Sequence, residues 1–318
     1  MKQRGYDPDF HPVLPLLPGV SDELADPSRI GEFRGRLMEF VPPAPPRDDI
    51  LQEDRRVPGP EGAPDVPVRI YRPSVSSGEP TAGLFEIHGG GFITGSIEMM
   101  DAWCQQAVEQ LGVVVVSVEY RLAPEHPFPA APEDCYAALG WMSRSAGDLG
   151  IDPERIAVVG QSAGGGLAAA TALLARDRGG PAIRLQVLEI PELDDRLDTP
   201  SMHEFDDTPL WNRPNAVWSW RHYLGADHDG EVSPYAAPAR ARDLAGLPPA
   251  YVSTMEFDPL RDEGIQYALR MLQAGVSVEL HSFPGTFHGS SLLPTADVSR
   301  RGSAELWHVL GRHLGAGS

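Results

Sequence analysis

The pentapeptide Gly160-Gln161-Ser162-Ala163-Gly164 constrains the fold more than any other feature of the sequence. The apolar residues 156–159 before it are typical of a buried strand, and the small residues 165–175 after it are typical of a helix. A serine in a sharp strand-to-helix turn exposes its hydroxyl oxygen, and flanking glycines are needed because side chains there would meet neighbouring backbone. The helix dipole then faces developing negative charge. The motif therefore predicts that Ser162 is a nucleophile.

These glycines allow other interpretations. Residues 164–169 fit the dinucleotide pattern G-x-G-x-x-A, with Glu189 at a distance suited to a ribose. A dinucleotide fingerprint begins in the first turn after the strand, whereas Gly164 lies four residues beyond Gly160, which disfavours this interpretation. A phosphate loop would need Lys-Ser or Lys-Thr at residues 166–167. Close packing of a small-residue helix on a sheet is a further interpretation, and it is compatible with a nucleophilic serine.

Short β-rich runs alternate with helical patterns from Val66 onward, which indicates a mostly parallel sheet flanked by helices. The expected strands are residues 66–71, 84–87, 113–120, 155–160, 184–190, 250–255 and 276–283. Residues 191–249 exceed the usual crossover length, and residues 1–46 combine amphipathic pieces such as 30–40 with proline clusters. We expect a single domain over residues 1–318, with the N-terminal arm (1–46) and the insertion (191–249) lying over its body.

Three consecutive glycines follow the expected strand 84–87, in the sequence His88-Gly89-Gly90-Gly91-Phe92. They offer unobstructed backbone N–H groups, and two such donors aimed at one point stabilise an oxyanion. His88 could be a base, but a histidine in this position more often holds the loop by hydrogen bonds, and we favour the structural role.

A nucleophilic serine needs a histidine to take its proton. The histidines after Ser162 are His203, His222, His228, His281, His288, His308 and His313. Only His288 lies in a glycine-flanked loop (284–289) after a strand, where the catalytic side chains of parallel sheets gather. His281 lies inside that strand and is expected to pack.

The histidine in turn needs a carboxylate to orient it. Asp258 follows strand 250–255 and therefore lies at the same sheet edge as Ser162 and His288. Its position before Pro259 also suits a helix N-cap, which is the competing interpretation. The rival acids are Glu256, Asp262 and Glu263. We prefer Asp258 because of its placement.

Charge and cysteine content exclude several classes of function. Against 26 Lys and Arg, 45 Asp and Glu give a net charge of −19, which repels nucleic acid and anionic lipid. Cys104 and Cys135 form no zinc-ligand pattern, so no metal site is expected and a reducing compartment is favoured. The sequence shows neither a signal-peptide pattern nor the ~20 apolar residues of a membrane span. The expected location is cytoplasmic.

Five motifs in order carry a resemblance to a known family. They are HGGGF (88–92), YRLAPEHPFPAAPEDC (120–135), GQSAGGGLA (160–168), EFDPLRDEG (256–264) and FPGTFHG (283–289). In these, the chain from Val66 onward resembles the hormone-sensitive-lipase-like α/β-hydrolases, and especially their heroin-esterase-like branch, which is of the acetyl-esterase type. Gln161 stands where much of the family has aspartate, although this branch shares glutamine. Glu86, in a strand that is usually apolar, is unexplained.

The resemblance implies an α/β-hydrolase fold in which the N-terminal arm and the insertion form a helical cap. It also implies that Ser162, His288 and Asp258 are nucleophile, base and orienting acid. The oxyanion hole would consist of the N–H groups of Gly90, Gly91 and Ala163, and no cofactor or metal would take part.

The expected activity is hydrolysis of short-chain, acetyl-type esters of apolar or aromatic alcohols. Phe92 and Trp211 are candidate substrate contacts, although aromatic residues of the insertion such as Trp211, Phe205, Trp218 and Trp220 could equally be core. The alternatives are an amidase or deacetylase with the same triad, and a ligand-binding protein without catalysis. The expected partner is a small ester, and a homodimer through strand 276–283 is a further expectation by analogy.

Overall fold

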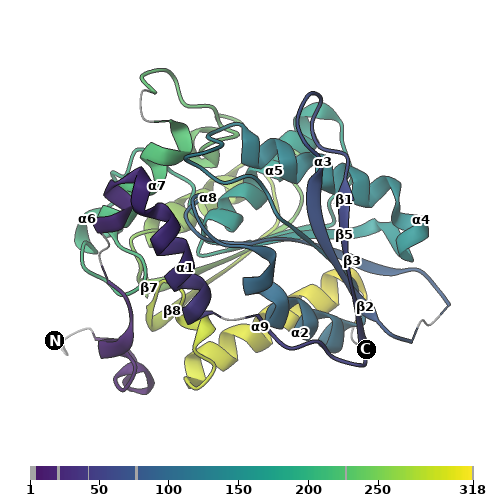
Figure 1. The fold of residues 1–318 in the computed structure, drawn as a ribbon, viewed down its shortest axis with the longest axis horizontal. Helices are drawn as coiled ribbons and strands as arrows, with labels where there is room; N and C mark the ends of the chain where they lie inside the picture. The colour runs from purple at the N-terminus through teal and green to yellow at the C-terminus, as the bar shows by residue number, and fades with distance from the viewer. Residues whose placement is uncertain (1–4, 20–21, 42, 76–77, 226–227, 317–318) are drawn as a thin grey trace.

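The computed structural model describes residues 5–19, 22–41, 43–75, 78–225 and 228–316, and its centre is an eight-stranded sheet. The strand order is β1-β2-β4-β3-β5-β6-β7-β8; β3 to β8 run parallel to one another, and β2 pairs antiparallel with both β1 and β4. The sheet runs through the middle of the molecule (Figure 1). The strands are β1 Ile50–Val57, β2 Val66–Pro73, β3 Thr81–Ile87, β4 Val114–Val118, β5 Ile151–Gln161, β6 Leu185–Glu189, β7 Ala250–Phe257 and β8 Val278–Phe287. The expected α/β-hydrolase architecture is confirmed.

Helices cover both faces of this sheet. The α-helices are α1 Ile30–Phe40, α2 Asp101–Leu111, α3 Ala130–Arg144, α4 Ala146–Leu149, α5 Ala163–Arg178, α6 Pro200–Glu204, α7 Arg213–Leu224, α8 Arg261–Gln273 and α9 Asp297–Leu314. The 3₁₀ helices are η1 Pro8–Phe10, η2 Leu14–Leu16, η3 Asp22–Ala25, η4 Pro27–Arg29, η5 Ile97–Met100, η6 Pro238–Arg240 and η7 Ser290–Leu292. No helix in the described part of the chain is long and apolar enough to cross a membrane.

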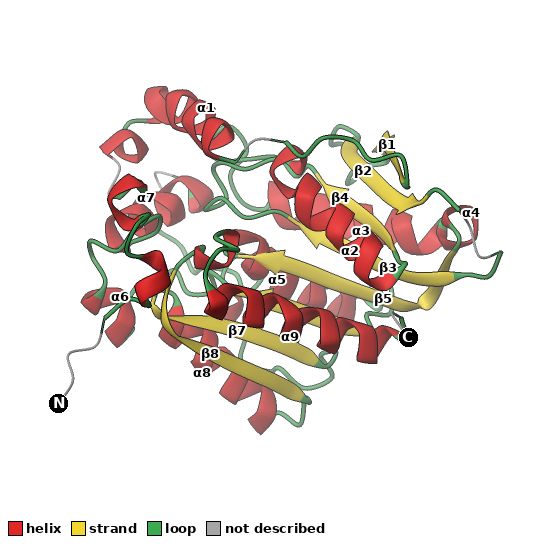
Figure 2. Ribbon diagram, turned by 90° about the horizontal axis from the view of Figure 1, so that it is seen from below, coloured by secondary structure: helices red, strands yellow, loops and turns green. Residues whose placement is uncertain are grey.

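Alternate residues of each strand serve two separate cores, as the pleat of a sheet requires. Phe85 and Val116 lie in the core beneath α3, α5 and α8, whereas Leu84 and Val115 lie in the core beneath α2 and α9. Figure 2 shows α2 and α9 on one side of the sheet. Because helices cover both faces, the central strands are continuously apolar.

The sheet differs from the predicted one at its two ends. Strand β1 was not predicted, because five consecutive polar residues (52–56) hide its period, and the strand lies at the exposed edge of the sheet. Strand β8 continues to Phe287, so residues 284–287, expected in a loop, are strand. His281 packs inside this strand as expected, with its ring 5.5 Å from that of Tyr251 and 6.1 Å from that of Phe283, and it also pairs with Glu279 at 3.1 Å.

The arm and the insertion lie side by side at the carboxyl edge of the sheet, where α1 is next to α7 in both views (Figures 1 and 2). His222 of α7 bonds the Leu24 carbonyl at 2.7 Å. The Arg34 guanidinium on α1 donates to the carbonyls of Ile93 and Ala123 at 2.7 and 2.9 Å. Residues 1–4, 20–21, 42 and 226–227 belong to the predicted cap and lie outside the described residues.

Candidate active site

Ser162 occupies the turn between β5 and α5 with φ 58° and ψ −123°, a conformation that side-chain-bearing residues rarely adopt. Main-chain hydrogen bonds hold it there. Its N–H donates to the Glu189 carbonyl at 2.9 Å, and its carbonyl accepts from the Glu192 N–H at 3.0 Å. Strained residues of this kind persist only where the surroundings determine them, and they cluster at functional sites.

The glycines on either side of this turn leave no room for a side chain. A Cβ on Gly160 would lie 2.1 Å from the Gly164 carbonyl oxygen, and a Cβ on Gly164 would lie 2.0 Å from the Ile87 carbonyl oxygen. The G-x-S-x-G pattern is therefore a steric requirement of this turn. The helix α5 begins at Ala163, so Gly164 lies inside it, and the first-turn position of a dinucleotide fingerprint is not formed by residues 164–169.

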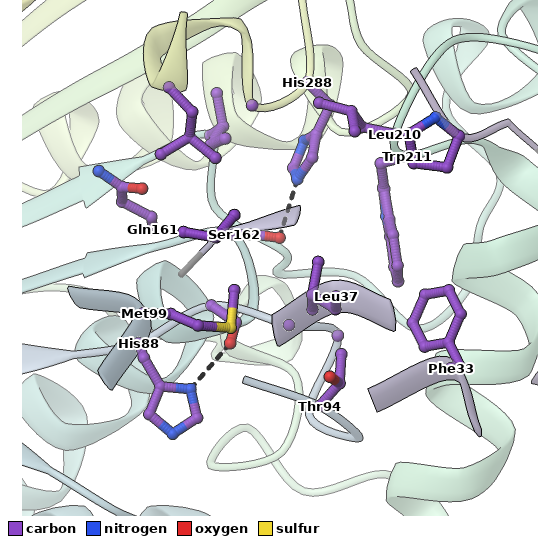
Figure 3. Close-up of a pocket in the computed structure, with 18 of the residues that line it drawn as sticks. Phe33, Leu37, His88, Thr94, Met99, Gln161, Ser162, Leu210, Trp211 and His288 are labelled. Atoms are coloured by element: carbon purple, nitrogen blue, oxygen red, sulfur yellow. Dashed lines mark hydrogen bonds between the residues drawn. The ribbon is translucent and has the colours of Figure 1, made fainter. Parts of the chain in front are cut away.

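Ser162, His288 and Asp258 come together at the carboxyl ends of β5, β8 and β7. Figure 3 shows the bond between Ser162 and His288. The distance from His288 Nε2 to Ser162 Oγ is 2.9 Å, and the distance from His288 Nδ1 to Asp258 Oδ2 is 2.8 Å. Asp258 is fully buried, and the other two side chains are also buried. With Nδ1–H donated to the carboxylate, Nε2 is left as an acceptor for the serine hydroxyl proton.

Asp258 also makes the contact that its competing interpretation predicts. Its second oxygen, Oδ1, accepts the N–H of Leu260 at 2.9 Å and so closes the turn that leads into α8, which begins at Arg261. Asp258 therefore makes both predicted contacts, one at the entry to α8 and one with His288. The rival acid Glu256 bonds the Gly285 N–H at 2.7 Å and holds the end of β8.

The glycine loop lies against the same turn. The amides of Gly90, Gly91 and Ala163 donate no hydrogen bond to another described residue, so three N–H groups beside Ser162 are available to a ligand. Burial lowers the pKa of His88 to about 4, and the neutral ring bonds the Gly89 carbonyl through Nδ1 at 2.8 Å. These contacts fit the structural role predicted for His88.

A cavity of about 290 Å³ opens onto Ser162 and His288. The N-terminal arm supplies Pro18, Gly19, Phe33, Arg36, Leu37 and Val41 to its wall, and the insertion supplies Leu210 and Trp211. The rest of the lining is His88, Gly89, Gly90, Gly91, Thr94, Met99, Met100, Gln161, Ser162, Ile190, His288, Gly289 and Leu292. Most of this wall is apolar, which suits an uncharged ligand.

The aromatic candidates separate into wall and core. Trp211 lines the cavity, and its ring lies 5.9 Å from that of His288. Phe92 was expected as a substrate contact, but it does not line the cavity: its ring is buried and stacked on Tyr223 at 4.0 Å. Trp220 packs against Phe92, in agreement with the core alternative.

Comparison with known proteins supports the same fold and class. Residues 84–292 match the family described as the alpha/beta hydrolase fold. The chain belongs to this family. It is 39% identical over 314 residues to carboxylesterase NlhH of Mycobacterium tuberculosis, covering 95% of this chain and 97% of that protein. An ethyl acetate hydrolase of Pseudomonas putida is 36% identical over 257 residues, 78% of this chain and 79% of that protein.

Among solved structures, bacterial heroin esterase is similar with a TM-score of 0.92 and 52% identity, covering 97% of this chain and 98% of that one. The resemblance to hormone-sensitive-lipase-like α/β-hydrolases is therefore confirmed. The protein is a hydrolase of the esterase class.

Gln161 of this α/β hydrolase supports the turn from behind. Its amide donates to Glu189 Oε2 at 3.0 Å, and burial raises the pKa of Glu189 to about 7. An aspartate at position 161 would bring a second carboxylate toward Glu189, so the neutral amide is the better partner here. The Glu189 carboxylate therefore has a hydrogen-bond partner inside the protein, the amide of Gln161.

One cluster with the spacing of metal ligands occurs in the described part of the hydrolase, formed by Glu279, His281 and Glu305. Arg312 and His281 already bond Glu279 at 2.6 and 3.1 Å, and none of the three lines the catalytic cavity.

Two groups of residues at the site were not predicted from the sequence. Phe33 and Leu37 reach the cavity from α1, a helix whose sequence has no catalytic motif. Glu192 is fully buried three residues beyond the end of β6, and its N–H donates to the Ser162 carbonyl. A buried acid just past the carboxyl end of a parallel strand is the signal that could have identified it.

Proposed function

We propose that this hydrolase is a carboxylesterase that cleaves short-chain, acetyl-type esters of apolar or aromatic alcohols through Ser162, His288 and Asp258. One observation carries the proposal: an unbroken hydrogen-bonded chain runs from Asp258 Oδ2 through His288 to Ser162 Oγ, with 2.8 and 2.9 Å between heavy atoms. This arrangement makes a hydroxyl nucleophilic without a metal or an organic cofactor.

In the first step, Ser162 Oγ attacks the ester carbonyl carbon while His288 Nε2 takes the hydroxyl proton. The carbonyl oxygen becomes an oxyanion, which the N–H groups of Gly90, Gly91 and Ala163 would stabilise. When the bond to the alcohol oxygen breaks, the imidazolium returns its proton to the leaving alcohol. The product of this step is an acyl-serine.

In the second step, water attacks the acyl-serine carbonyl and His288 takes the proton of the water. The second tetrahedral intermediate uses the same three amides. When the bond to Ser162 Oγ breaks, the proton passes from the imidazolium to the serine, and the carboxylic acid leaves. The buried carboxylate of Asp258 stabilises the imidazolium that forms in both steps.

The small, mostly apolar cavity supports short acyl groups on apolar alcohols, and a similar protein is described as an ethyl acetate hydrolase. A panel of p-nitrophenyl esters from C2 to C12 tests the acyl preference. The proposal expects kcat/KM to be highest at the short end. A maximum above C8 would show that the acyl pocket is larger than we infer.

The N-terminal arm and the insertion would act as the cap of a single α/β-hydrolase domain. Phe33 and Leu37 of the arm and Leu210 and Trp211 of the insertion all line the cavity, which supports this assignment. The cap would exclude water from the intermediate and contribute to the selection of the substrate.

The nucleophile is tested with p-nitrophenyl acetate. Ser162→Ala should lower kcat by at least about 10³-fold, because triad residues act as one unit. Equal rates for the wild type and Ser162→Ala would remove Ser162 from the mechanism. Matched aryl acetate and acetanilide substrates separate an esterase from an amidase, and a wild type that binds both but turns over neither would be a ligand-binding protein.

We also propose a homodimer in which β8, at the edge of the sheet, forms the contact. Leu280 on this strand is 38% exposed, and an unpaired strand edge favours association. Light scattering of the purified protein measures the oligomeric state directly. A cytoplasmic location stays a prediction of the sequence.

A further inference from the structure

The two peptide groups that flank Gly91 in the glycine loop are both held by hydrogen bonds. The carbonyl of Gly90, in the peptide that carries the Gly91 N–H, accepts the N–H of Thr94 at 3.0 Å and that of Ile93 at 3.2 Å. The carbonyl of Gly91 accepts the hydroxyl of Ser219 at 2.6 Å. Ser219 belongs to α7 of the insertion, and its side chain is fully buried.

This second anchor matters because Gly91 has φ +58° and no side chain of its own. Glycine has more backbone freedom than any other residue, so external contacts must hold its N–H in one direction. There is also no space for a larger residue: a Cβ on Gly91 would lie 2.5 Å from the Trp211 ring and 3.0 Å from Ser219 Oγ. The insertion thus fixes the loop through Ser219.

Ser219 also lies near Glu192, but it has one hydroxyl proton and cannot donate it to both neighbours. Glu192 Oε1 lies 3.4 Å from Ser219 Oγ, and the hydroxyl proton is already directed at the closer Gly91 carbonyl. At 3.4 Å the two oxygens are farther apart than in a usual O–H···O hydrogen bond, and the serine has only one proton to donate. An ionised Glu192 would accept this proton and compete with the Gly91 carbonyl for it, whereas a protonated Glu192 would donate its own proton to Ser219 Oγ and leave the serine proton on Gly91.

The surroundings of Glu192 favour this neutral form. Its side chain is fully buried, and Oε2 has no hydrogen-bond partner. Burial raises the pKa of Glu192 to about 8; the hydrogen bond with Ser219 opposes this shift, and the nearby charge of Asp258 adds to it. Glu263 and Tyr223 are the other titratable groups that interact with Glu192.

We infer that Glu192 and Ser219 are positioning residues of the oxyanion hole: Glu192, as a neutral acid, donates to Ser219, and Ser219 donates to the Gly91 carbonyl. The insertion thereby orients the Gly91 N–H toward the oxyanion. This inference rests on the proposed function, because it assumes that Gly91 binds an oxyanion.

Ser219→Ala and Ser219→Cys test the anchor in p-nitrophenyl acetate hydrolysis. Losing an oxyanion donor costs roughly 10²–10³ in kcat, so a misdirected donor should lower the kcat of Ser219→Ala by about 10- to 100-fold, with KM changed less than about threefold. Cysteine keeps most of the volume and a weak donor, so the loss should be smaller. A kcat within twofold of the wild type in both variants would overturn the inference.

Ser299→Ala is the matched control. Ser299 is a buried helical serine that donates to one main-chain carbonyl, that of Ser290, at 2.8 Å, and it does not line the catalytic cavity. It should lose a similar amount of thermal stability as Ser219→Ala but keep kcat within about twofold. Equal losses of kcat in Ser299→Ala and Ser219→Ala would show that general destabilisation, and not the anchor, causes the effect.

The pH profile tests the proton on Glu192. The wild-type kcat should fall as the pH rises past about 8, because the ionised carboxylate no longer donates to Ser219. Glu192→Gln carries a permanent donor and should keep its kcat through this range. A wild type without this alkaline decline, or a variant with the same decline, would overturn the role of Glu192.

The controls separate this inference from the proposed function. A wild type that fails to hydrolyse p-nitrophenyl acetate, or a fully active Ser162→Ala, contradicts the esterase mechanism itself. An active wild type with an inactive Ser162→Ala and an unaffected Ser219→Ala contradicts only the anchor.

Discussion

One oxygen of Asp258 bonds the Leu260 N–H at the entry to α8, and the other bonds His288. A substitution can therefore test the structural contact and the catalytic contact separately. Asparagine at this position can still accept the Leu260 N–H through its amide oxygen, but it presents an NH₂ group or a weaker acceptor to His288 Nδ1. The imidazole then loses its fixed tautomer. We expect Asp258→Asn to fold with nearly wild-type stability and to lose roughly 10⁴-fold in kcat.

Thermal unfolding and p-nitrophenyl acetate kinetics measure both properties, with Asp258→Ala as the comparison. Alanine removes both contacts, so this variant should lose stability as well as activity. If Asp258→Asn kept more than a tenth of the wild-type kcat, the carboxylate would have no part in orienting His288.

Glu86, which the sequence left unexplained, is a buried acid in the middle of the sheet. Its Oε2 accepts the hydroxyl of Ser117 at 2.5 Å across β3 and β4, and burial raises the pKa of Glu86 to about 8. The folded protein therefore binds this proton more tightly than the unfolded chain does. The stability that Glu86 contributes is complete below its unfolded pKa of about 4.5 and is lost as the pH rises toward 8.

Glu86→Gln should remove this pH dependence. Between pH 4.5 and 8 we expect the wild-type free energy of unfolding to decrease relative to that of the variant by roughly 2–4 kcal/mol. Urea unfolding at several pH values measures this difference. The other buried acids contribute equally to the free energies of unfolding of both proteins, so their contributions cancel. Parallel curves for the two proteins would show that Glu86 has an ordinary pKa.

At the scale of elements, the contact between α1 and the body of the protein depends strongly on Arg34. This side chain donates to the carbonyls of Ile93 and Ala123 and pairs with Glu125 at 2.8 Å. The same helix supplies Phe33 and Leu37 to the cavity. We expect Arg34→Met to raise KM for p-nitrophenyl acetate several-fold and to change kcat less, because the triad stays intact while the cavity wall loosens.

Arg29→Met is the control for this experiment. Arg29 precedes α1 and, among the described residues, pairs with two acids of the arm, Glu23 and Glu32. Exposed ion pairs of this kind contribute little to stability, so the kinetics should be unchanged. Equal KM values for wild type and Arg34→Met would mean that the position of α1 does not affect substrate binding.

Helices and strands could be predicted where the spacing of the apolar residues and the residue types favour the same structure. The apolar strands β3 to β7 and the small-residue helix α5 are legible because helices cover both faces of the sheet. Strand β1 was not, because an edge strand with little burial has no apolar period to read. In α8, Leu269 and Leu272 have the spacing of one helical face but are exposed, and Tyr267, Ala268 and Met271 are buried instead.

At the scale of the molecule, the cavity is a product of three distant segments: the N-terminal arm, the insertion and the carboxyl edge of the sheet. The convergence of Ser162, His288 and Asp258 could be predicted because each of them follows a strand, and parallel strands bring their carboxyl ends together. The cavity wall could not, because no local pattern shows which helix of the arm meets which helix of the insertion. Ser219 is such a case, since only its contact with Gly91 distinguishes it from other helical serines.

Covalent labelling with a fluorophosphonate, followed by mass mapping of the peptides, tests the central claim most directly. The reagent requires both a nucleophile and its activation. The account predicts one label per chain, located on Ser162, and no label in Ser162→Ala. A label on another residue, or an unlabelled wild type that is folded, would contradict it.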